Sequence, residues 1–436
     1  MAVDYAYPPQ LAQFLRPAWE ASPDAPPLLD PDHLERVLTV AYQASLLREE
    51  DRTVRVRIVV APPEDFDVNA GPPAGLQPLV FEEPLPYTPE ELRRLALAAK
   101  YHRALVGVTA LPDRGRCQIW GIVQSGPGWI QVAQGARGPA PAPPASALCV
   151  RLLGPGRMAV GRGLTTLAEL RDGVVGGPGM DLFGSRWVPE RFADSRADLA
   201  KLHAREREEG ALRGEAWASL APDLIRTVSQ SMVRRFLASM VSAHHGGTVV
   251  MLPMAGAADL VGPRSPLRLK YAFRDGPARW RYRRILLALM AALARAGARA
   301  GMETVDGDAY ARLQNQDLAS LRDAIFEMSQ LIGALTEVDG AVTMTTGFEI
   351  LGFGAEIVGD LPHATEVARS LDLEGDDFVN EPLTADGTRH RSAYRLCARV
   401  PGALVLVVSQ DGGVRFVSTH RGAVTVWDHA VELLDV

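Results

Sequence analysis

The sequence predicts an α/β protein of two domains: a C-terminal domain with a central mixed β-sheet flanked by helices, and a separate α/β domain before it. Apolar residues recur at helical spacing in several segments, and short apolar runs typical of strands lie between them. At 436 residues the chain is long for one domain. A charged, helical stretch over residues 191–220 resembles a connecting helix. We therefore expect domains over residues 1–235 and 236–436.

The N-terminal part carries the signals of its own α/β unit. Asp32 precedes a helix with an apolar face, and residues 54–58 alternate valine and isoleucine with arginine, which is typical of a half-buried strand. Thr88-Pro89-Glu90-Glu91 is a capping box that opens another helix. Further strands are expected over residues 105–108, 118–123 and 129–132, and the proline-rich residues 137–147 are expected to form a surface loop.

Helices and strands also alternate in the C-terminal part. Residues 232–243 predict a helix and residues 246–253 a strand. Two more helices are expected over residues 280–298 and 308–336, the second with leucines and isoleucines three and four residues apart. Two strands follow, over residues 342–345 and toward Leu351. Residues 402–418 then predict a buried strand, an Asp-Gly-Gly turn and a returning strand.

Charge and composition narrow the class of protein. A formal net charge of −6 makes nucleic acid an unlikely partner and argues against anionic lipid. The three cysteines are far apart and form neither a disulfide framework nor a zinc spacing, which suits a reducing compartment. No apolar run reaches the roughly 18 residues of a membrane span, and the N-terminus lacks the layout of a signal peptide. We expect a cytoplasmic protein without a membrane segment.

Three polar clusters stand at the ends of predicted strands and helices: Asp339–Ala341, Gly387–Arg391 and Ser409–Asp411. Each has a structural explanation of its own, since Asp-Gly makes turns and arginines usually face solvent. The middle cluster is unusual because it puts two arginines and a histidine in the first turn of a predicted helix, where Thr388 can serve as the cap. A helix N-terminus already carries partial positive charge. Such a turn is suited to a polyphosphate, which backbone N–H groups and arginine forks would bind.

The clusters also carry a family resemblance. In chain order, Asp339-Gly340-Ala341, LGFGAEI over residues 351–357, GTRHR over residues 387–391 and VVS over residues 407–409 resemble the motifs of the diadenylate cyclase (DAC) domain family. The resemblance covers roughly residues 240–425. It implies a DAC domain over residues 236–436, with residues 1–235 in the position of a sensor region that receives an unknown small-molecule or protein input.

The family's activity implies what this chain would do. Two ATP molecules condense to cyclic di-AMP and two pyrophosphates with Mg²⁺ or Mn²⁺, in a site shared with a second DAC domain that faces the first in a homo-oligomer. Catalysis of this kind depends on positioning and on charge stabilisation. By resemblance, the residues expected to act are the catalytic Asp339, Arg389, His390 and Arg391, the nucleotide-binding Gly340, Ala341, Gly387, Thr388, Ser409 and Gln410, and the metal ligands Asp339 and Asp411.

One departure from the family pattern leaves alternatives open. Where the family often has Ser-Glu-Glu, this chain has Ser409-Gln410-Asp411, with one carboxylate fewer and the other on a shorter side chain. A DAC-like receptor that binds nucleotide without turnover is the first alternative, and an assembly subunit is the second. Three other features have simpler explanations: His244-His245 as a helix end, residues 279–284 as the start of an amphipathic helix, and the glycines of residues 152–163 as turns.

Overall fold

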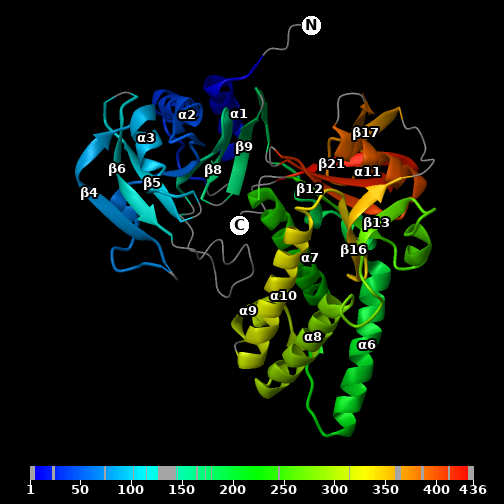
Figure 1. Cartoon of the computed structure of the whole chain (residues 1–436). Coiled ribbons are helices and arrows are strands. Elements are labelled where there is room, and N and C mark those ends of the chain that lie inside the picture. The colour runs from blue at the N-terminus through cyan, green and yellow to red at the C-terminus, as the bar shows by residue number, and fades with distance from the viewer. Residues whose placement is uncertain are drawn as a thin grey trace. The chain divides into compact units, whose positions relative to one another are not determined.

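The chain folds as a mixed α/β protein in a computed structural model (Figure 1). The structure describes residues 5–21, 25–72, 75–101, 103–113, 115–125, 144, 146–163, 165–171, 173–177, 179–243, 246–313, 315–358, 365–383, 387–410 and 413–430. In these ranges, no helix is long and apolar enough to cross a membrane. The α/β class predicted from the sequence is confirmed.

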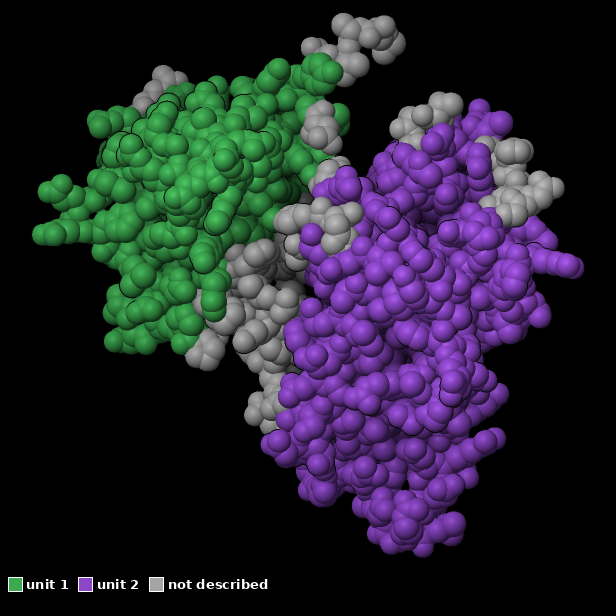
Figure 2. Space-filling model, viewed as in Figure 1, with its two compact units in different colours: residues 1–132, 137–179, 435–436 green, residues 133–136, 180–434 purple. Residues whose placement is uncertain are grey.

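The chain packs into two compact units that divide near residue 179 (Figure 2). The first comprises residues 1–132, 137–179 and 435–436, and the second comprises residues 133–136 and 180–434. The boundary expected near residue 235 falls inside a helix, α7 (Pro222–Ser242), and is therefore displaced. Met232, Phe236 and Leu237 of this helix are buried in the core of the second unit, so the chain cannot divide there.

The first unit contains one large sheet. Among its described residues the strand order is β10-β9-β8-β7-β3-β5-β6-β4, and only β3 and β5 run parallel. Its elements are α1 (Pro8–Glu20), α2 (Pro31–Ser45), β1 (Arg48–Glu49), β2 (Arg52–Thr53), β3 (Val56–Val60), η1 (Pro63–Asp65), β4 (Gln77–Pro86), α3 (Pro89–Leu95), β5 (Ala104–Ala110), β6 (Cys117–Gln124), β7 (Leu148–Gly154), β8 (Arg157–Arg162), β9 (Thr165–Arg171) and β10 (Val174–Gly176).

Alternating side chains give this sheet two different faces. Val56 and Ile58 of β3 pack with Leu11 of α1 and Leu38 of α2 in the main core. Val59, the next residue after Ile58, joins a smaller cluster on the other face with Phe66 and Trp120. Such alternation is expected because successive strand side chains point to opposite faces. The helices therefore cover one face and the segment after β3 covers part of the other.

The second unit is built around a larger mixed sheet. Among its described residues the strand order is β13-β16-β15-β12-β19-β20-β21-β17-β18. Its elements are η2 (Leu182–Gly184), α5 (Trp187–Glu190), α6 (Ala193–Leu212), β11 (Ser219–Leu220), α7, β12 (Gly247–Leu252), η3 (Ala257–Leu260), β13 (Leu267–Ala272), α8 (Arg281–Arg299), β14 (Thr304–Val305), α9 (Gly307–Arg312), α10 (Gln316–Leu335), β15 (Ala341–Thr345), β16 (Ile350–Ile357), β17 (Glu366–Ser370), β18 (Phe378–Pro382), α11 (Thr388–Arg399), β19 (Leu404–Val408), β20 (Val414–His420) and β21 (Ala423–His429).

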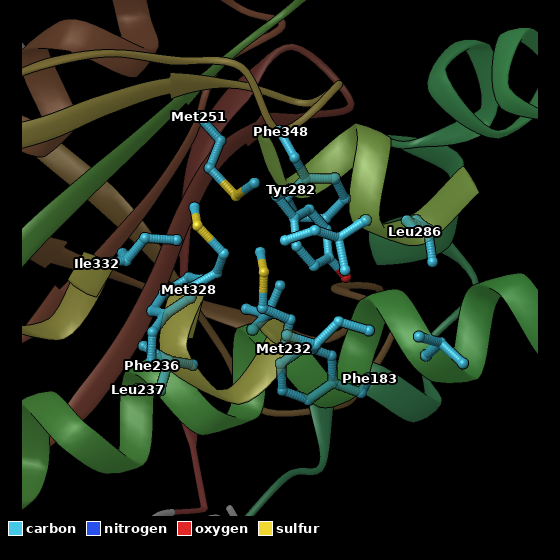
Figure 3. Close-up of a cluster of buried hydrophobic side chains, with 14 of the residues drawn as sticks. Phe183, Met232, Phe236, Leu237, Met251, Tyr282, Leu286, Met328, Ile332 and Phe348 are labelled. Atoms are coloured by element: carbon cyan, nitrogen blue, oxygen red, sulfur yellow. The ribbon is translucent and has the colours of Figure 1, made fainter. Parts of the chain in front are cut away.

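Helices cover both faces of the second sheet. Val249 and Met251 of β12 join the core made with α7, α8 and α10, and Figure 3 shows the contributions of Met232, Tyr282 and Met328 from these helices. Val250 of the same strand joins a separate core made with α11. The end of α10 and the start of α11 thus reach the sheet from opposite sides.

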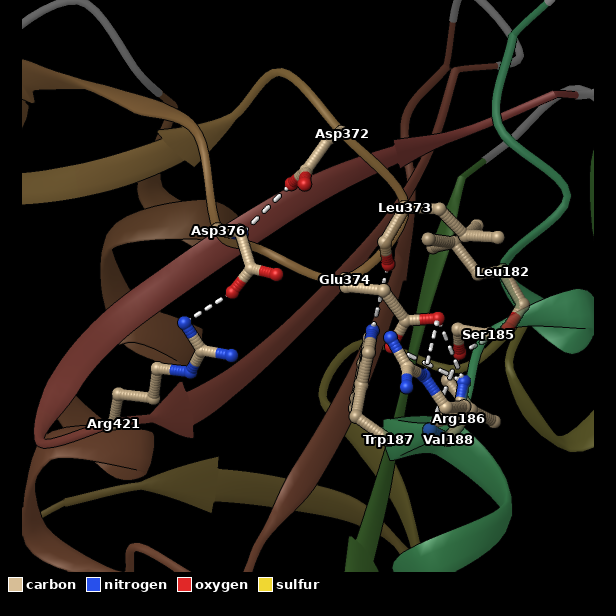
Figure 4. A network of polar contacts seen from close by, with 10 residues as sticks. All are labelled: Leu182, Ser185, Arg186, Trp187, Val188, Asp372, Leu373, Glu374, Asp376 and Arg421. Atoms are coloured by element: carbon tan, nitrogen blue, oxygen red, sulfur yellow. Dashed lines mark hydrogen bonds and ion pairs between the residues drawn. The ribbon is translucent and has the colours of Figure 1, made fainter.

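A network of polar contacts fixes the start of the second unit to the β17–β18 connection (Figure 4). The backbone N–H of Arg186 donates to both carboxylate oxygens of Glu374, at 3.1 and 3.2 Å, and the Trp187 indole donates to the Leu373 carbonyl. The Trp187 ring also stacks on Trp427 of β21, with ring centroids 4.2 Å apart. Residues 182–188 are therefore a structural part of the second unit.

Several local expectations need correction. The strand predicted over residues 54–58 is β3, which is buried rather than half-buried, and Arg57 within it donates to Ser125 Oγ at 3.0 Å. The helix predicted over residues 308–336 is two helices, α9 and α10. Of the glycines in residues 152–163, Gly156 lies in the turn of the β7–β8 hairpin as expected, whereas Gly154 and Gly161 lie in its strands. The strand predicted over residues 129–132, His244, His245 and most of residues 137–147 lie outside the described residues.

Candidate functional site

Two of the three polar clusters meet at one pocket in the second unit. The pocket, about 120 Å³ in volume, is open to solvent and lies between the start of β15, the end of β16 and the first turn of α11. The predicted Gly340, Ala341, Thr388 and Arg389 all line it. The complete lining is Thr248, Gly340, Ala341, Ala355, Ile357, Thr388, Arg389 and Ser392. Two residues of the Asp-Gly-Ala turn are thus brought to one site with two residues of α11 that follow them by at least 47 positions in the sequence.

Gly340 is required by the backbone at this site. It has a φ of +111°, in the region that favours glycine. A Cβ there would lie 2.5 Å from the carbonyl carbon of Gly354, closer than packed atoms tolerate. Gly354 itself has a φ of +63° and lies in the bulged part of the β15–β16 pairing. The Asp-Gly-Ala turn is therefore seated directly on the LGFGAEI strand, whose Ala355 and Ile357 form the next wall of the pocket.

The start of α11 presents backbone N–H groups and positive charge to the pocket. Gly387 is the N-cap, with an extended backbone, and Thr388 is the first helical residue. This corrects the expectation that Thr388 is the cap. Gly387 has no side chain that could accept a hydrogen bond from the first turn, and the first N–H groups of any helix have no partner within it. With no acidic residue and two arginines in that turn, α11 begins in a form suited to an anion.

Gly246 connects the arginine cluster to the β19–β20 hairpin. A Cβ on Gly246 would lie 2.7 Å from the Arg389 Nη1 and 3.1 Å from the backbone nitrogen of Gln410. The Arg389 guanidinium therefore lies against the backbone that leads into β12, next to the predicted Gln410. Ser409 is oriented within the hairpin, since its backbone N–H and its Oγ donate to the Gly413 carbonyl, at 2.9 and 3.1 Å.

The other predicted residues lie outside the pocket lining. Asp339 is exposed in the turn directly before Gly340, and Arg391 and Gly387 are exposed at the start of α11. His390 is half-buried, with its ring 6.5 Å from the Tyr394 ring one turn along. Asp411 lies outside the described residues.

A divalent ion could use the donors available at this edge. Within the described ranges no group of three or more His, Cys, Asp or Glu side chains is arranged to hold a metal by itself. Mg²⁺ commonly takes only one or two protein carboxylates and completes its shell with phosphates and water. The carboxylate of Asp339, beside a pocket suited to phosphate, has the right chemistry for that role. The residues present therefore fit a metal brought by a nucleotide better than a permanently bound one.

The site also contains residues that the sequence reasoning missed. Gly246, Thr248 and Ser392 lie in or beside the pocket, and none belongs to a quoted motif. Gly246-Gly247 directly before a buried strand was a usable signal, because paired glycines at a strand start often allow close approach. Cys397 on the buried side of α11 is not part of the site: burial raises the pKa of its thiol to about 12, so it stays neutral.

Comparison with known proteins bears on the first unit. Residues 23–124 match the family described as "Probable sensor domain DACNV". No curated protein and no solved structure matches the chain. The family covers about a quarter of the chain and lies wholly within the first unit. A sensor domain in the N-terminal part, expected from the sequence only by analogy, is thus supported by an independent match.

Proposed function

We propose that this protein is a diadenylate cyclase controlled by an N-terminal sensor. The second unit would condense two ATP molecules into cyclic di-AMP and release two pyrophosphates. The observation that carries the proposal is the shared pocket of Gly340, Ala341, Thr388 and Arg389. In it, the turn directly after the exposed Asp339 and a cationic helix start line the same space. The sensor family supports it from the other end of the chain, because sensors of this kind accompany DAC domains.

Each residue has a chemical task in this proposal. The first turn of α11 and the Arg389 guanidinium would bind the phosphates, and Gly340 and Ala341 would let the nucleotide lie close to the backbone. Asp339 would hold Mg²⁺ or Mn²⁺ and orient the attacking 3′-hydroxyl. The bound ion would neutralise phosphate charge as pyrophosphate leaves. His390 and Arg391 would contribute from outside the lining, and Ser409, Gln410 and Asp411 from the hairpin.

A second copy of the unit is part of the proposal. In this proposal each unit would bind one ATP, while the reaction joins two nucleotides through two 3′–5′ bonds. Each 3′-hydroxyl must therefore attack the α-phosphate of an ATP in another pocket, which requires two units face to face. An open pocket at the surface of the unit, as observed, is compatible with such pairing.

Product formation tests the proposal directly. The purified 436-residue chain is incubated with ATP and Mn²⁺, or with ATP and Mg²⁺, and nucleotides are identified by mass spectrometry. Cyclic di-AMP and pyrophosphate in a ratio of one to two would support the cyclase. ATP binding without product, also in the presence of cell extract that could supply the sensor input, would refute it.

Gln410 favours one other candidate, a receptor that binds nucleotide without turnover. Gln410 is exposed at the hairpin, and its backbone lies next to Gly246. The DAC domain family often has a glutamate at the position of Gln410. A receptor would bind ATP or a cyclic dinucleotide with an affinity that Asp339→Asn leaves unchanged. Restoring the family residue with Gln410→Glu would then be expected to create or increase turnover, whereas an active cyclase would change little.

A further inference from the structure

The first unit contains a pocket of its own, with a volume of about 460 Å³. Its walls come from α2, from the end of β4 and its connection to α3, and from the β5–β6 turn with the start of β6. The lining residues are Arg36, Pro84, Leu85, Pro86, Tyr87, Thr88, Leu111, Gly115, Arg116, Cys117 and Gln118. All of them fall within residues 23–124, the range that matches the sensor family. This volume lies within the range of small-molecule sites.

The charges on the wall select an anion. Two arginines line the pocket and no carboxylate does. Arg116 is paired with Asp113, at 2.8 Å, but Arg36 makes no ion pair with any residue that the structure describes. A guanidinium facing a pocket without a carboxylate is available to bind the carboxylate or phosphate of a ligand.

The remaining wall is neutral and combines apolar with polar side chains. Pro84, Leu85, Pro86 and Leu111 form one side. Cys117 adds no negative charge, because burial raises the pKa of its thiol to about 11, more than the charge of Arg36 lowers it. Tyr87, Thr88 and Gln118 are the polar neutral residues of this wall. A ligand that pairs with Arg36 and also contacts the apolar residues of the wall carries one anionic group on a short apolar body.

Hydrogen bonds hold the three walls together without a ligand. The Tyr87 hydroxyl donates to the Val37 carbonyl of α2, at 2.9 Å. His33, one turn before Arg36 on α2, contacts the Asp113 carbonyl of the β5–β6 turn through Nε2, at 3.1 Å. The position of Arg36 relative to the apolar wall is therefore set in advance, which lowers the entropic cost of binding.

We propose that this pocket binds a small anionic metabolite, a carboxylate or phosphate on a short apolar body, and that this ligand is the input to the first unit. The inference rests on the sensor part of the proposed function and needs no cyclase activity. Arg36 is its main anion contact.

The test measures binding to the full chain by ligand-observed NMR titration with three probes: hexanoate, inorganic phosphate and hexylamine. Hexanoate should bind saturably and more tightly than phosphate, and hexylamine should not bind. Arg36→Gln should weaken hexanoate about tenfold or more, the scale of a charge-assisted hydrogen bond, and Arg36→Lys should weaken it less. Arg52→Gln, at an exposed arginine of β2 outside the pocket, is the matched control and should change nothing.

Two results would overturn the inference: no saturable binding of either anion, or binding that is equal in wild type and Arg36→Gln. Hexanoate that binds no more tightly than phosphate would refute the role of the apolar wall. Circular dichroism of each variant checks its fold. Since the readout contains no ATP, its failure is distinct from a failure of the cyclase assay. A chain that binds hexanoate through Arg36 and makes no cyclic di-AMP would refute the enzyme and leave the anion site standing.

Discussion

Gly340 shows why a single residue in the Asp-Gly-Ala turn is restricted. Its φ of +111° disfavours any side chain, and the adjoining Gly354 leaves no space for a Cβ. We predict that Gly340→Ala lowers the free energy of unfolding by about 1–3 kcal/mol, the cost of such backbone strain. Urea unfolding measures it. The control is Gly184→Ala, at an exposed glycine with ordinary φ and no atom within 4 Å, where equal destabilisation would contradict the argument.

Asp339 is expected to act in chemistry without contributing to stability. Its exposed position in the turn means that Asp339→Asn should change the free energy of unfolding by less than about 0.5 kcal/mol. Loss of the negative charge should nevertheless abolish cyclic di-AMP formation, because an amide binds Mg²⁺ or Mn²⁺ poorly and cannot help to activate the attacking 3′-hydroxyl. Product analysis and urea unfolding are measured on the same preparation. An unfolded variant would identify the residue as structural.

Arg389 and Arg395 lie on the same helix and allow a matched comparison. Both are exposed on α11, but only Arg389 lines the pocket. Arg389→Ala should weaken ATP binding by about 2 kcal/mol, as expected for hydrogen bonds between a guanidinium and phosphate. Arg395→Ala should leave the affinity nearly unchanged. Isothermal titration calorimetry measures the affinity of each variant for ATP. Equal losses of affinity in the two variants would mean that ATP binding depends only on the overall positive charge.

At the scale of elements, the sequence predicted most helices and strands but misread features set by tertiary structure. Thr88 was predicted correctly as the cap of α3, since its Oγ1 accepts from the Glu91 N–H, while the Glu91 carboxylate pairs with Arg94. The alternation of Arg55 and Arg57 with apolar residues indicated an exposed face. Arg57 is instead buried, because β3 lies inside its sheet and the segment after β3 covers part of that face. The cap of α11 is Gly387 and not Thr388, because Gly387 is the last residue with an extended backbone and Thr388 is already helical. Local patterns cannot report which strand becomes central.

The start of α2 provides a prediction on pH. His33 lies between the Asp30 carboxylate and the Asp113 carbonyl, so both of its ring nitrogens face oxygen acceptors. The hydrogen bond to Asp30 raises the pKa of His33 above its usual value despite burial, and the pKa of Asp30 is lowered. A raised histidine pKa gives stability that is complete below pH 6.5 and is lost as the pH rises through the folded-state pKa.

His33→Gln should therefore destabilise the chain more at pH 6 than at pH 8.5. Thermal unfolding of wild type and variant at both values measures the difference. The same comparison with His203→Gln is a control, since burial lowers the pKa of that histidine and opposes its protonation. A stability difference for His33→Gln that does not change with pH would contradict the charged pair.

The whole molecule explains the error in the domain boundary. The charged stretch over residues 191–220 has the composition of a connecting helix, but α6 within it buries Leu199 in the second unit's core and its Asp198 is paired with Arg283 of α8. Composition does not reveal one buried leucine or an ion pair to a distant helix. The candidate site was similarly predicted in part. Motif order identified four of the lining residues, Gly340, Ala341, Thr388 and Arg389. Gly246, Thr248 and Ser392 were missed because they lie outside the motifs and reach the site through the tertiary structure.

The boundary yields a prediction about fragments. Residues 180–436 keep α6, the whole of α7 and the contacts of Trp187 with β21, and should unfold in one cooperative transition. Residues 236–436 begin inside α7 and lose Leu224, Val228 and Met232, all buried in the core. Losing several large core side chains costs more than the stability of an ordinary domain, so this shorter fragment should aggregate. A soluble, cooperative fragment 236–436 would restore the boundary near residue 235.

Under the proposed function, fragment 180–436 should also make cyclic di-AMP, at a rate different from that of the full chain. Hexanoate should not change the rate of the fragment, because the unit that receives the input is gone.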